Sequence, residues 1–417
     1  MRLTSIAVSS LAAFAFQLPL TASAAPAAAD QASCGGYPRL AVNTPAGFCV
    51  AVLSKKFKFA RGIQPMPNGD VIVVDMGGWN PGQGSVWLLK PAAGEYEKTL
   101  LMKGLDRPNG IGLGPDKLLY VGVVGGIFRF DPANPAGTRK DVIGGGSGVA
   151  ALPGRGRHAL TTMRFDSKGD LFVNVGSSSD HCESEDNKAP AASQPCAETQ
   201  GPNALGVIRK YQMKWPAGTV ATSEIYASGL RNSMALAFQP NNGALWQAEN
   251  ARDAIHAAIA GMKNDNELPH DELNLIQRGQ NYGWPYCYDE GKPSPEYPAT
   301  KCEAYRAPVR LLPAHAAPLG MLFYTGSRLP ARYRESLIIG YHGYRQHGHR
   351  LVAALPDQSG APRGALVDLI SDWGSKPNQA MGAPVDVKQG PDGNIYLAED
   401  HSGRVIRLEY GGGAAQK

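Results

Sequence analysis

The feature that most constrains the fold of this chain is an irregular internal repeat, in which a turn is followed by a short run of strand-forming residues. A turn containing Gly, Asp or Asn precedes five such runs, namely VIVVD (71–75), LLYVGV (118–123), LFVNVG (171–176), ALWQAEN (244–250) and NIYLAED (394–400). A sixth run, LIIGYHG (337–343), lacks the turn signal. Val, Ile, Tyr, Phe and Trp favour a pleated, half-buried surface. Each copy therefore predicts a turn followed by a β-strand.

The spacing of these copies predicts the architecture. Repeats of about 45–55 residues are typical of four-stranded sheets arranged radially, and two of the intervals are longer. Six copies predict an all-β fold, a six-bladed β-propeller of four-stranded antiparallel blades. A β-sandwich or a solenoid with coincidental turns is the alternative. The 50 Gly and 32 Pro residues also favour many turns and few long helices, with one short helix expected around residues 254–262.

The N-terminal segment predicts export. Arg2 precedes an uncharged apolar run over residues 5–20, and Ala22-Ser23-Ala24 fits a small-x-small cleavage site. We expect residues 1–24 to be a signal peptide and the mature protein to be periplasmic or secreted. No other stretch approaches about 18 apolar residues, so stable membrane insertion is not expected. The remaining chain is divided into a disulfide-tethered N-terminal segment (25–55), a propeller domain (56–411) and a flexible tail (412–417).

The cysteines agree with an exported protein. Six cysteines form three couples that are close in the sequence, Cys34/Cys49, Cys182/Cys196 and Cys287/Cys302. Disulfides are expected in an oxidising compartment, and pairing within each couple is favoured among the combinations that six cysteines allow. The absence of C-x-x-C and C-x-x-C-H argues against a zinc knuckle and an attached c-type haem.

Four segments carry a resemblance to a known family. They are Gly156-Arg157-His158 followed by FDSKGDLFVNVGSSSDHC; Ser228-Gly229-Leu230-Arg231-Asn232 followed by MALAFQPNNGALWQAEN; PHDELN (269–274) followed by NYGWP (281–285); and GAPVDVKQGPDGNIYLAEDHSGRVIRLEY (382–410). With these motifs in this order, the chain resembles the pyrroloquinoline-quinone (PQQ)-dependent glucose/sorbosone dehydrogenases over most of its length. The SSS run followed by a Cys resembles the sorbosone-dehydrogenase branch more closely.

The resemblance implies two catalytic residues and a polar partner. Oxidation of an alcohol by hydride transfer needs a base for the hydroxyl proton and an oriented hydride acceptor. His158 matches the family's catalytic histidine, and a structural histidine is the alternative. Arg231 matches a residue that stabilises charge on the quinone oxygen, while Asn232 would orient the ring. For Arg231, pairing with a carboxylate of the channel is the alternative.

Further residues are candidates for holding the cofactor. PQQ carries three carboxylates, so cationic groups are expected near it. Arg345 is the first candidate, ahead of Arg350 and Lys376, although none of the three aligns cleanly with the family's cofactor-binding positions. Asn109 lies where the family approaches the quinone.

The resemblance also implies calcium, a hard cation that prefers carbonyl and carboxylate oxygens. The carbonyls of Ala251 and Arg252 occupy the place of the cofactor-side ligands, although the Arg252 side chain adds an unexpected positive charge. Glu272 and Tyr282 imply a second ion, to which Asp289 or Glu290 could contribute. A solvated turn is the alternative for Asp271 and Glu272. The histidines at 342, 347 and 349 are interpreted as loop residues rather than a transition-metal site.

These observations predict a PQQ-dependent quinoprotein that oxidises a sugar or a sugar-derived alcohol or aldehyde. Without a haem motif, the chain would pass electrons to an external acceptor, a cytochrome or a quinone. The net charge of +5 is modest and scattered, which argues against nucleic-acid binding. Two other functions stay open: a Ca²⁺-dependent lactonase and a non-catalytic exported propeller that binds glycans or proteins.

Overall fold

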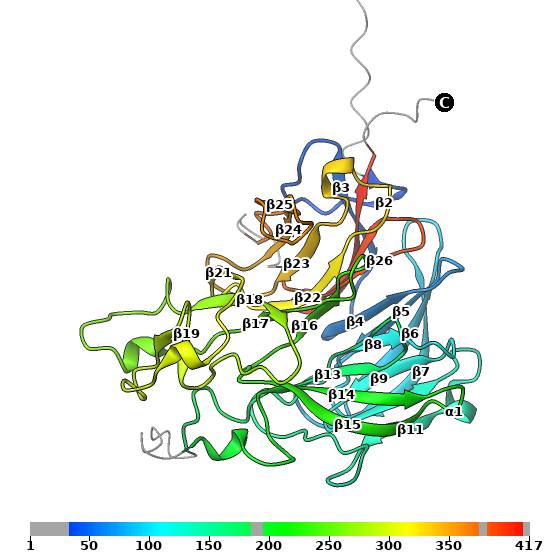
Figure 1. Ribbon diagram of the computed structural model, residues 1–417. Helices are drawn as coiled ribbons and strands as arrows, with labels where there is room; N and C mark the ends of the chain where they lie inside the picture. The colour runs from blue at the N-terminus through cyan, green and yellow to red at the C-terminus, as the bar shows by residue number, and fades with distance from the viewer. Residues whose placement is uncertain (1–32, 185–194, 375–381, 412–417) are drawn as a thin grey trace, which may run out of the picture.

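The computed structural model describes residues 33–184, 195–374 and 382–411 (Figure 1). The predicted signal peptide, the predicted tail and Lys376 lie outside the described residues. Within them the secondary structure is almost entirely β-strand. No helix in the described ranges is long and apolar enough to cross a membrane.

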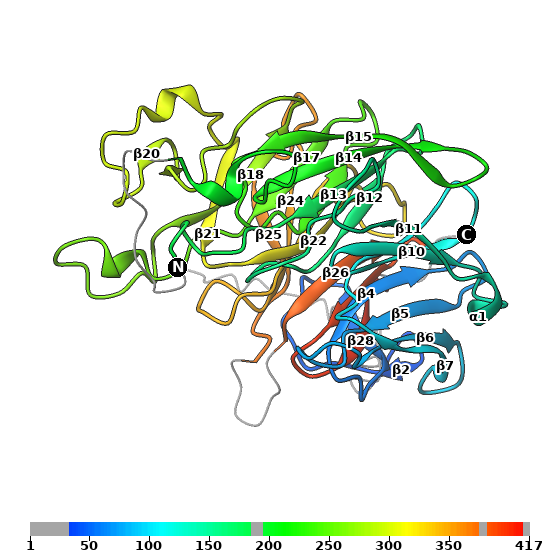
Figure 2. The same cartoon turned by 90° about the horizontal axis from the view of Figure 1, so that it is seen from below.

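Six sheets of four antiparallel strands surround one axis (Figures 1 and 2). Their first strands contact one another in a closed ring that runs β4, β8, β12, β16, β22, β26 and back to β4. The prediction of a six-bladed propeller is therefore confirmed, and the sandwich and solenoid alternatives are excluded.

The blades follow the chain in order. The first comprises β4 (Ala60–Pro65), β5 (Val71–Asp75), β6 (Gly84–Lys90) and β7 (Glu97–Leu105). The second comprises β8 (Ile111–Leu113), β9 (Leu119–Val123), β10 (Gly126–Phe130) and β11 (Lys140–Gly144). The third comprises β12 (Met163–Phe165), β13 (Leu171–Val175), β14 (Val207–Lys214) and β15 (Thr219–Ser228). The fourth comprises β16 (Ala235–Phe238), β17 (Leu245–Glu249), β18 (His270–Ile276) and β21 (Arg310–Ala314). The fifth comprises β22 (Pro318–Phe323), β23 (Leu337–Tyr341), β24 (Arg350–Ala354) and β25 (Leu366–Ile370). The sixth comprises β26 (Pro384–Gln389), β27 (Ile395–Glu399), β28 (Arg404–Tyr410) and β3 (Phe48–Ser54).

Each of the six repeated runs forms the second strand of a blade, that is β5, β9, β13, β17, β23 or β27. All residues of β5, β13, β17, β23 and β27 are buried, because neighbouring blades cover both faces of each inner strand. This explains why the runs are almost continuously apolar, whereas a strand with one face in water would alternate.

The sixth blade closes the ring with a strand from the N-terminal region. β3 pairs antiparallel with β28, placing Val52 opposite Ile406 and Val50 opposite Leu408. Because β3 precedes residue 56, the propeller sheet begins earlier in the chain than the domain boundary inferred from the sequence.

The other secondary structure is short. Small two-stranded sheets form from β1 (Ser33–Cys34) with β2 (Tyr37–Pro38) and from β19 (Cys287–Tyr288) with β20 (Lys292–Pro293). One α-helical turn, α1 (Pro135–Thr138), and 3-10 turns η1 (Ala197–Thr199), η2 (Ile255–Ala257), η3 (Cys302–Ala304) and η4 (Ala331–Tyr333) complete the described elements. The helix expected over 254–262 is therefore only η2, since Ala254 and Gly261 flank it with positive φ values of 51° and 80°.

The three disulfides join Cys34 to Cys49, Cys182 to Cys196, and Cys287 to Cys302. Pairing within each sequence couple is thus confirmed. Each bridge closes a loop of 14 or 15 residues.

A recurring carboxylate fixes the segments that precede the innermost strands. At the end of β5, Asp75 accepts hydrogen bonds from the backbone N–H groups of Lys58 and Phe59 at 3.0 and 2.8 Å. Glu399, at the end of β27, accepts one from Ala383 at 3.2 Å. In these two blades, the acidic residue at the end of the second strand therefore orients the loop that leads into the first strand of the same blade.

Ring closure predicts a large cost for a cavity on β3. Leu53 is fully buried, so Leu53→Ala is expected to lower the free energy of unfolding by about 2–5 kcal/mol, measured by urea denaturation. Leu100→Ala is the control on an outer strand, where the side chain is 43% exposed. Its effect is expected to stay within about 0.5 kcal/mol, and equal losses in the two variants would contradict a structural role of β3 in closure.

Candidate active site

A cleft of about 460 Å³ lies where loops from five of the six blades meet. Its walls include Arg61 at the start of β4, His158 ahead of β12 and Arg231 ahead of β16. Residues after the second strands of the fifth and sixth blades, Arg345 and Asp400, complete it. Ligand pockets usually enclose about 300–1,000 Å³, so the cleft is large enough for a small molecule.

The His158 ring is held in one tautomer. Its Nδ1 lies 3.1 Å from the Ser177 carbonyl oxygen and 2.9 Å from Ser177 Oγ. Ser177 Oγ donates its own proton to the Ser179 carbonyl at 2.6 Å. Both Ser177 atoms therefore accept from His158, which places the ring proton on Nδ1 and the lone pair on Nε2.

The environment of His158 favours the neutral ring. Burial, and then the positive charge of Arg231, lower the pKa of His158 well below its usual value. A neutral imidazole with a free Nε2 lone pair can accept a proton. Gly176 is required beside it, because any side chain there would collide with His158.

Arg231 is buried and its guanidinium is fully oriented. Nε donates to the Asp180 carbonyl at 3.2 Å, and Nη1 donates to the Asn250 carbonyl at 3.1 Å. Nη2 pairs with Asp180 Oδ1 and lies 3.3 Å from Asp253 Oδ2. Burial opposes ionisation of Asp180, but hydrogen bonding from His181 and the charge of Arg231 hold its pKa well below the usual range. The pairing considered as an alternative does occur, yet Arg231 still lines the cleft with His158.

Asn232 lines the same cleft and offers an unused acceptor. Its backbone N–H donates to Glu249 Oε1 at 2.8 Å. Its side-chain Oδ1 is buried and has no hydrogen-bond partner in the described ranges. An orphaned buried oxygen is costly, so this position is suited to a ligand that donates a hydrogen bond.

Asn109 does not line the cleft, which corrects the prediction that it approaches the quinone. Its Oδ1 accepts a hydrogen bond from Arg61 Nε at 2.8 Å, and its Nδ2 donates to the Thr161 carbonyl at 3.3 Å. Arg61 does line the cleft and pairs with Asp400 at 2.6 Å. Asn109 therefore orients Arg61 through Oδ1 and is itself anchored to Thr161 through Nδ2.

Arg345 also lines the cleft and is partly exposed. Its Nη1 pairs with Asp265 Oδ1 at 2.9 Å, and its Nη2 lies 3.9 Å from Asp253 Oδ1. The nearby histidines do not converge: His342 contacts Asp400, His347 contacts Glu267, and His349 contacts the Gly382 carbonyl. All three histidines lie in the loop between β23 and β24, in agreement with their interpretation as loop residues.

A second, much smaller cavity of about 30 Å³ lies against the cleft. Ala251, Arg252, Glu272 and Tyr282, the four predicted metal-site residues, all line it together with Glu249. A cavity of this size can hold a water molecule or a cation. Asp271 and Glu272 are buried within β18, so the alternative of a solvated turn is wrong.

Two carboxylates face each other across this cavity. Glu249 on β17 and Glu272 on β18 are directly opposite in the sheet, with 5% and 9% exposure. Burial raises the pKa of Glu249 to about 7, and burial together with the charge of Glu249 raises the pKa of Glu272 well above its usual value. Buried like charges destabilise the fold unless a proton or cation separates them. This donor set fits a hard cation.

The other predicted ligands contribute in different ways. The Tyr282 hydroxyl donates to the Leu275 carbonyl at 2.7 Å and accepts from Gln277 N at 2.9 Å, which leaves only its backbone oxygen for a cation. The Arg252 charge is neutralised by Glu296 at 2.6 Å. Asp289 instead accepts from His270 and does not line the cavity.

The family model described as Glucose / Sorbosone dehydrogenase matches residues 150–407. The chain belongs to this family. An uncharacterized protein of Borreliella burgdorferi is 25% identical over 387 residues, 88% of this chain and 91% of the relative. The aldose sugar dehydrogenase YliI of Escherichia coli is 26% identical over 269 residues, 61% of this chain and 60% of that protein.

Solved structures share the fold of this glucose/sorbosone dehydrogenase family member. The calcium structure of a Trichoderma reesei carbohydrate-active enzyme of family AA12 has a TM-score of 0.68 at 20% identity, covering 90% of this chain and 98% of that one. The holo PQQ domain of a pyranose dehydrogenase from Coprinopsis cinerea has a TM-score of 0.66 at 20% identity, covering 90% and 99%.

Several residues of the cleft in this glucose/sorbosone dehydrogenase family member escaped the sequence motifs. They are Arg61, Trp79, His315 and Tyr344. Trp79 and Tyr344 are exposed at 61% and 55%, and form aromatic walls. The position of two of these residues in the repeat could have identified them. Arg61 and His315 lie at or just before the first strand of a blade, as His158 and Arg231 do.

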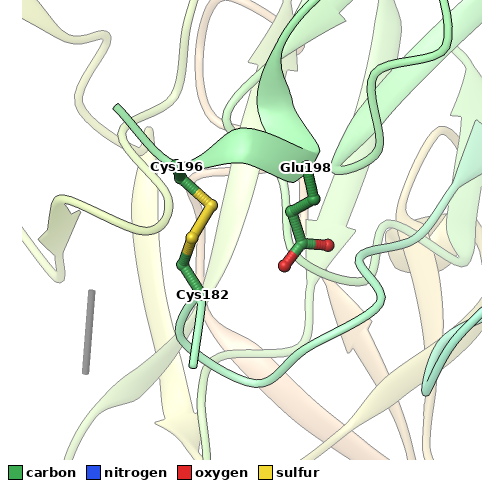
Figure 3. A group of neighbouring side chains, drawn as sticks. All are labelled: Cys182, Cys196 and Glu198. Carbon is green, nitrogen blue, oxygen red and sulfur yellow. A yellow bond between two sulfur atoms is a disulfide. The ribbon is translucent and has the colours of Figure 1, made fainter. Parts of the chain in front are cut away.

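Among the described residues, one further group combines side chains that can bind metals. It consists of Cys182, Cys196 and Glu198 (Figure 3). The two cysteines form a disulfide, so neither offers a thiolate. This group is therefore not a metal site.

The buried Arg61–Asp400 pair predicts a measurable loss of stability. Asp400→Ala leaves the Arg61 charge buried at 4% exposure, and is expected to reduce the free energy of unfolding by about 3–5 kcal/mol in urea denaturation. The control is Glu224→Ala, which breaks an ion pair with Arg278 at 72% side-chain exposure and is expected to cost at most about 1 kcal/mol. A similar small effect in both variants would refute the structural role of the pair.

Proposed function

We propose that this protein is a PQQ-dependent dehydrogenase that oxidises a sugar, or an alcohol or aldehyde derived from one. The observation that carries the proposal is the pairing of a neutral His158, with Nε2 free, and an oriented Arg231 on one cleft. Membership of the glucose/sorbosone dehydrogenase family supports it, and so does the shared fold of the pyranose dehydrogenase PQQ domain and of a PQQ-bound aldose sugar dehydrogenase from Streptomyces coelicolor.

The residues of the cleft fit PQQ. Four arginines line it, namely Arg61, Arg157, Arg231 and Arg345, and they suit a ligand with three carboxylates. The orphaned Asn232 Oδ1 suits a hydrogen-bond donor on that ligand. Trp79 and Tyr344 supply aromatic surface for a planar ring or for the face of a sugar. When bound, PQQ supplies the electrophilic carbon that accepts a hydride.

The chain's own residues perform the remaining steps. His158 Nε2 takes the proton of the substrate hydroxyl, and Nδ1–H stays bonded to Ser177, which keeps the ring in place as it becomes charged. Arg231 stabilises negative charge that develops opposite it in the cleft. The buried apolar side chains of Leu160 and Met234 line the same cleft and restrict water near the reacting hydroxyl.

The small acidic cavity is proposed to hold Ca²⁺. Glu249 and Glu272 would supply carboxylate oxygens, with backbone carbonyls of Ala251, Arg252 and Tyr282 as further ligands. The cation would relieve the repulsion between the two carboxylates and stiffen the wall that the cavity shares with the cleft.

The physiological setting is proposed as follows. Three disulfides support an oxidising, periplasmic or secreted location. Electrons would leave to an external acceptor, a cytochrome or a quinone, after each oxidation. Incubating the purified protein with PQQ, Ca²⁺, a dye acceptor and a panel of aldoses tests the activity. Lactone hydrolysis without PQQ would instead support a lactonase, and neither reaction would support a glycan- or protein-binding propeller.

Removing the proposed base should abolish turnover and leave the fold intact. His158→Ala is expected to lower kcat by about 10²–10⁴-fold, with PQQ binding within a few-fold of wild type by absorbance titration. His347→Ala is the control, because this ring is partly exposed and contacts the exposed Glu267. Comparable activity in the two variants would refute the base.

The activity should also persist below the ordinary histidine pKa. A base acts while it is neutral, and the pKa of His158 is lowered, so the neutral form survives as the pH falls through about 6.5. The acid limb of the kcat/KM profile is therefore expected below pH 6.5. A limb at or above that value contradicts this environment for His158.

The calcium proposal predicts a stabilisation that requires Glu272. After chelation with EDTA, Ca²⁺ at about 100 times its Kd is expected to stabilise the wild type by about 2.7 kcal/mol, followed as a rise in Tm. Glu272→Gln should lose this response, whereas Glu290→Gln, an exposed acidic neighbour, should keep it. Equal Ca²⁺ responses in the two variants would exclude the cavity as the site.

A further inference from the structure

One short segment holds both proposed catalytic groups. Ser177 binds the His158 ring through its carbonyl and hydroxyl oxygens, and its backbone N–H donates to the Arg231 carbonyl at 2.8 Å. Three residues later, Asp180 binds the Arg231 guanidinium through both its carbonyl and its carboxylate. The positions of His158 and Arg231 therefore depend on the conformation of residues 177–180, which we call the serine loop.

Glu198 organises the serine loop from outside the cleft. Its Oε2 accepts hydrogen bonds from the backbone N–H of Ser178 at 2.5 Å and from Ser178 Oγ at 2.7 Å. Its Oε1 accepts from Ser179 Oγ. Hydrogen bonds to an ionised acceptor are stronger than neutral ones, so this one carboxylate fixes two consecutive residues of the loop.

Covalent and backbone contacts hold Glu198 in place. It lies on η1, two residues after Cys196, and the bridge to Cys182 joins this turn to the end of the serine loop (Figure 3). The Cys182 backbone N–H donates to Ser179 Oγ at 2.8 Å, and the Leu205 N–H donates to the Glu198 carbonyl at 2.7 Å. Figure 3 shows the Glu198 carboxylate beside the disulfide.

The loop in turn orients the backbone that carries His158. The N–H groups of Arg157 and His158 donate to the carbonyls of Ser178 and Ser177, both at 3.1 Å. Shifting the serine loop would therefore move the ring and its backbone together. Glu198 does not line the cleft, so it reaches the reacting atoms only through this chain of contacts.

We propose that Glu198 is a positioning residue that, together with the Cys182–Cys196 bridge, holds the serine loop in the shape that aims His158 and Arg231 into the cleft. The proposal rests on the dehydrogenase function proposed above. It assigns a role to a residue outside the recognised motifs, and it explains why an acidic turn follows the disulfide.

The test is the substitution Glu198→Gln, which keeps the size of the side chain. Glutamine has only one acceptor oxygen, whereas the loop presents three donors, the Ser178 N–H and the hydroxyls of Ser178 and Ser179. The expected result is a fall in kcat of about 10–100-fold, with KM for the sugar within about threefold because Glu198 does not line the cleft. The matched control is Glu303→Gln, an exposed acid on η3 directly after a disulfide cysteine, which should retain wild-type kcat.

Hydrogen exchange supplies a readout that needs no activity. Peptides covering residues 155–183 should exchange faster in Glu198→Gln than in the wild type, while peptides from the other blades stay unchanged. If the wild type oxidises no sugar, the proposed function is wrong. The hydrogen-exchange result still tests whether Glu198 positions the serine loop, because it does not depend on activity. Unchanged exchange in this segment, or equal kcat losses in Glu198→Gln and Glu303→Gln, would overturn the proposal.

Discussion

Ring closure is the constraint on which the rest of the structure depends. Six blades share one axis only if the last sheet is completed, and here the strand that completes it, β3, comes before every blade in the chain. Closure brings the starts of the first strands together, which is how Arg61 and Asp400, 339 positions apart, form a buried ion pair. The cleft is a consequence of this geometry rather than of any local motif.

The cleft and the small cavity beside it follow a second rule, that most buried side-chain cations are paired with an acid. Arg61 is matched by Asp400, Arg231 by Asp180, and Arg252 by Glu296, each pair with both side chains nearly inaccessible. The pairs cost desolvation, but they fix cations in place before a ligand arrives, which reduces the entropy lost on binding. Glu249 and Glu272 differ from these ion pairs, because each faces another acid. This pairing of two buried acids is the observation on which the proposed cation site rests.

Much of this arrangement could be predicted from the sequence, because strand burial leaves a local imprint. The six apolar runs correctly located the second strand of each blade, and the motif residues His158, Arg231 and Asn232 all reach the cleft. The prediction that Asn109 reaches the cleft was wrong. Asn109 instead binds Arg61, which lines the cleft, and sequence order does not reveal this contact between side chains. Asp400 and the serine loop's dependence on Glu198 arise from contacts across blades or loops, which no single run of residues records.

Two residues belong to both cavities at once. Arg231 and Ala251 line the large cleft and also the small acidic cavity, so the two compartments share a wall. If a ligand bound in one compartment shifts this wall, it must change the affinity of the other compartment for its own ligand. Because coupling free energies are reciprocal, each ligand changes the affinity for the other by the same factor. With the proposed ion in the small cavity, a molecule that binds in the cleft would strengthen or weaken binding of that ion by the same factor by which the ion affects binding of the molecule.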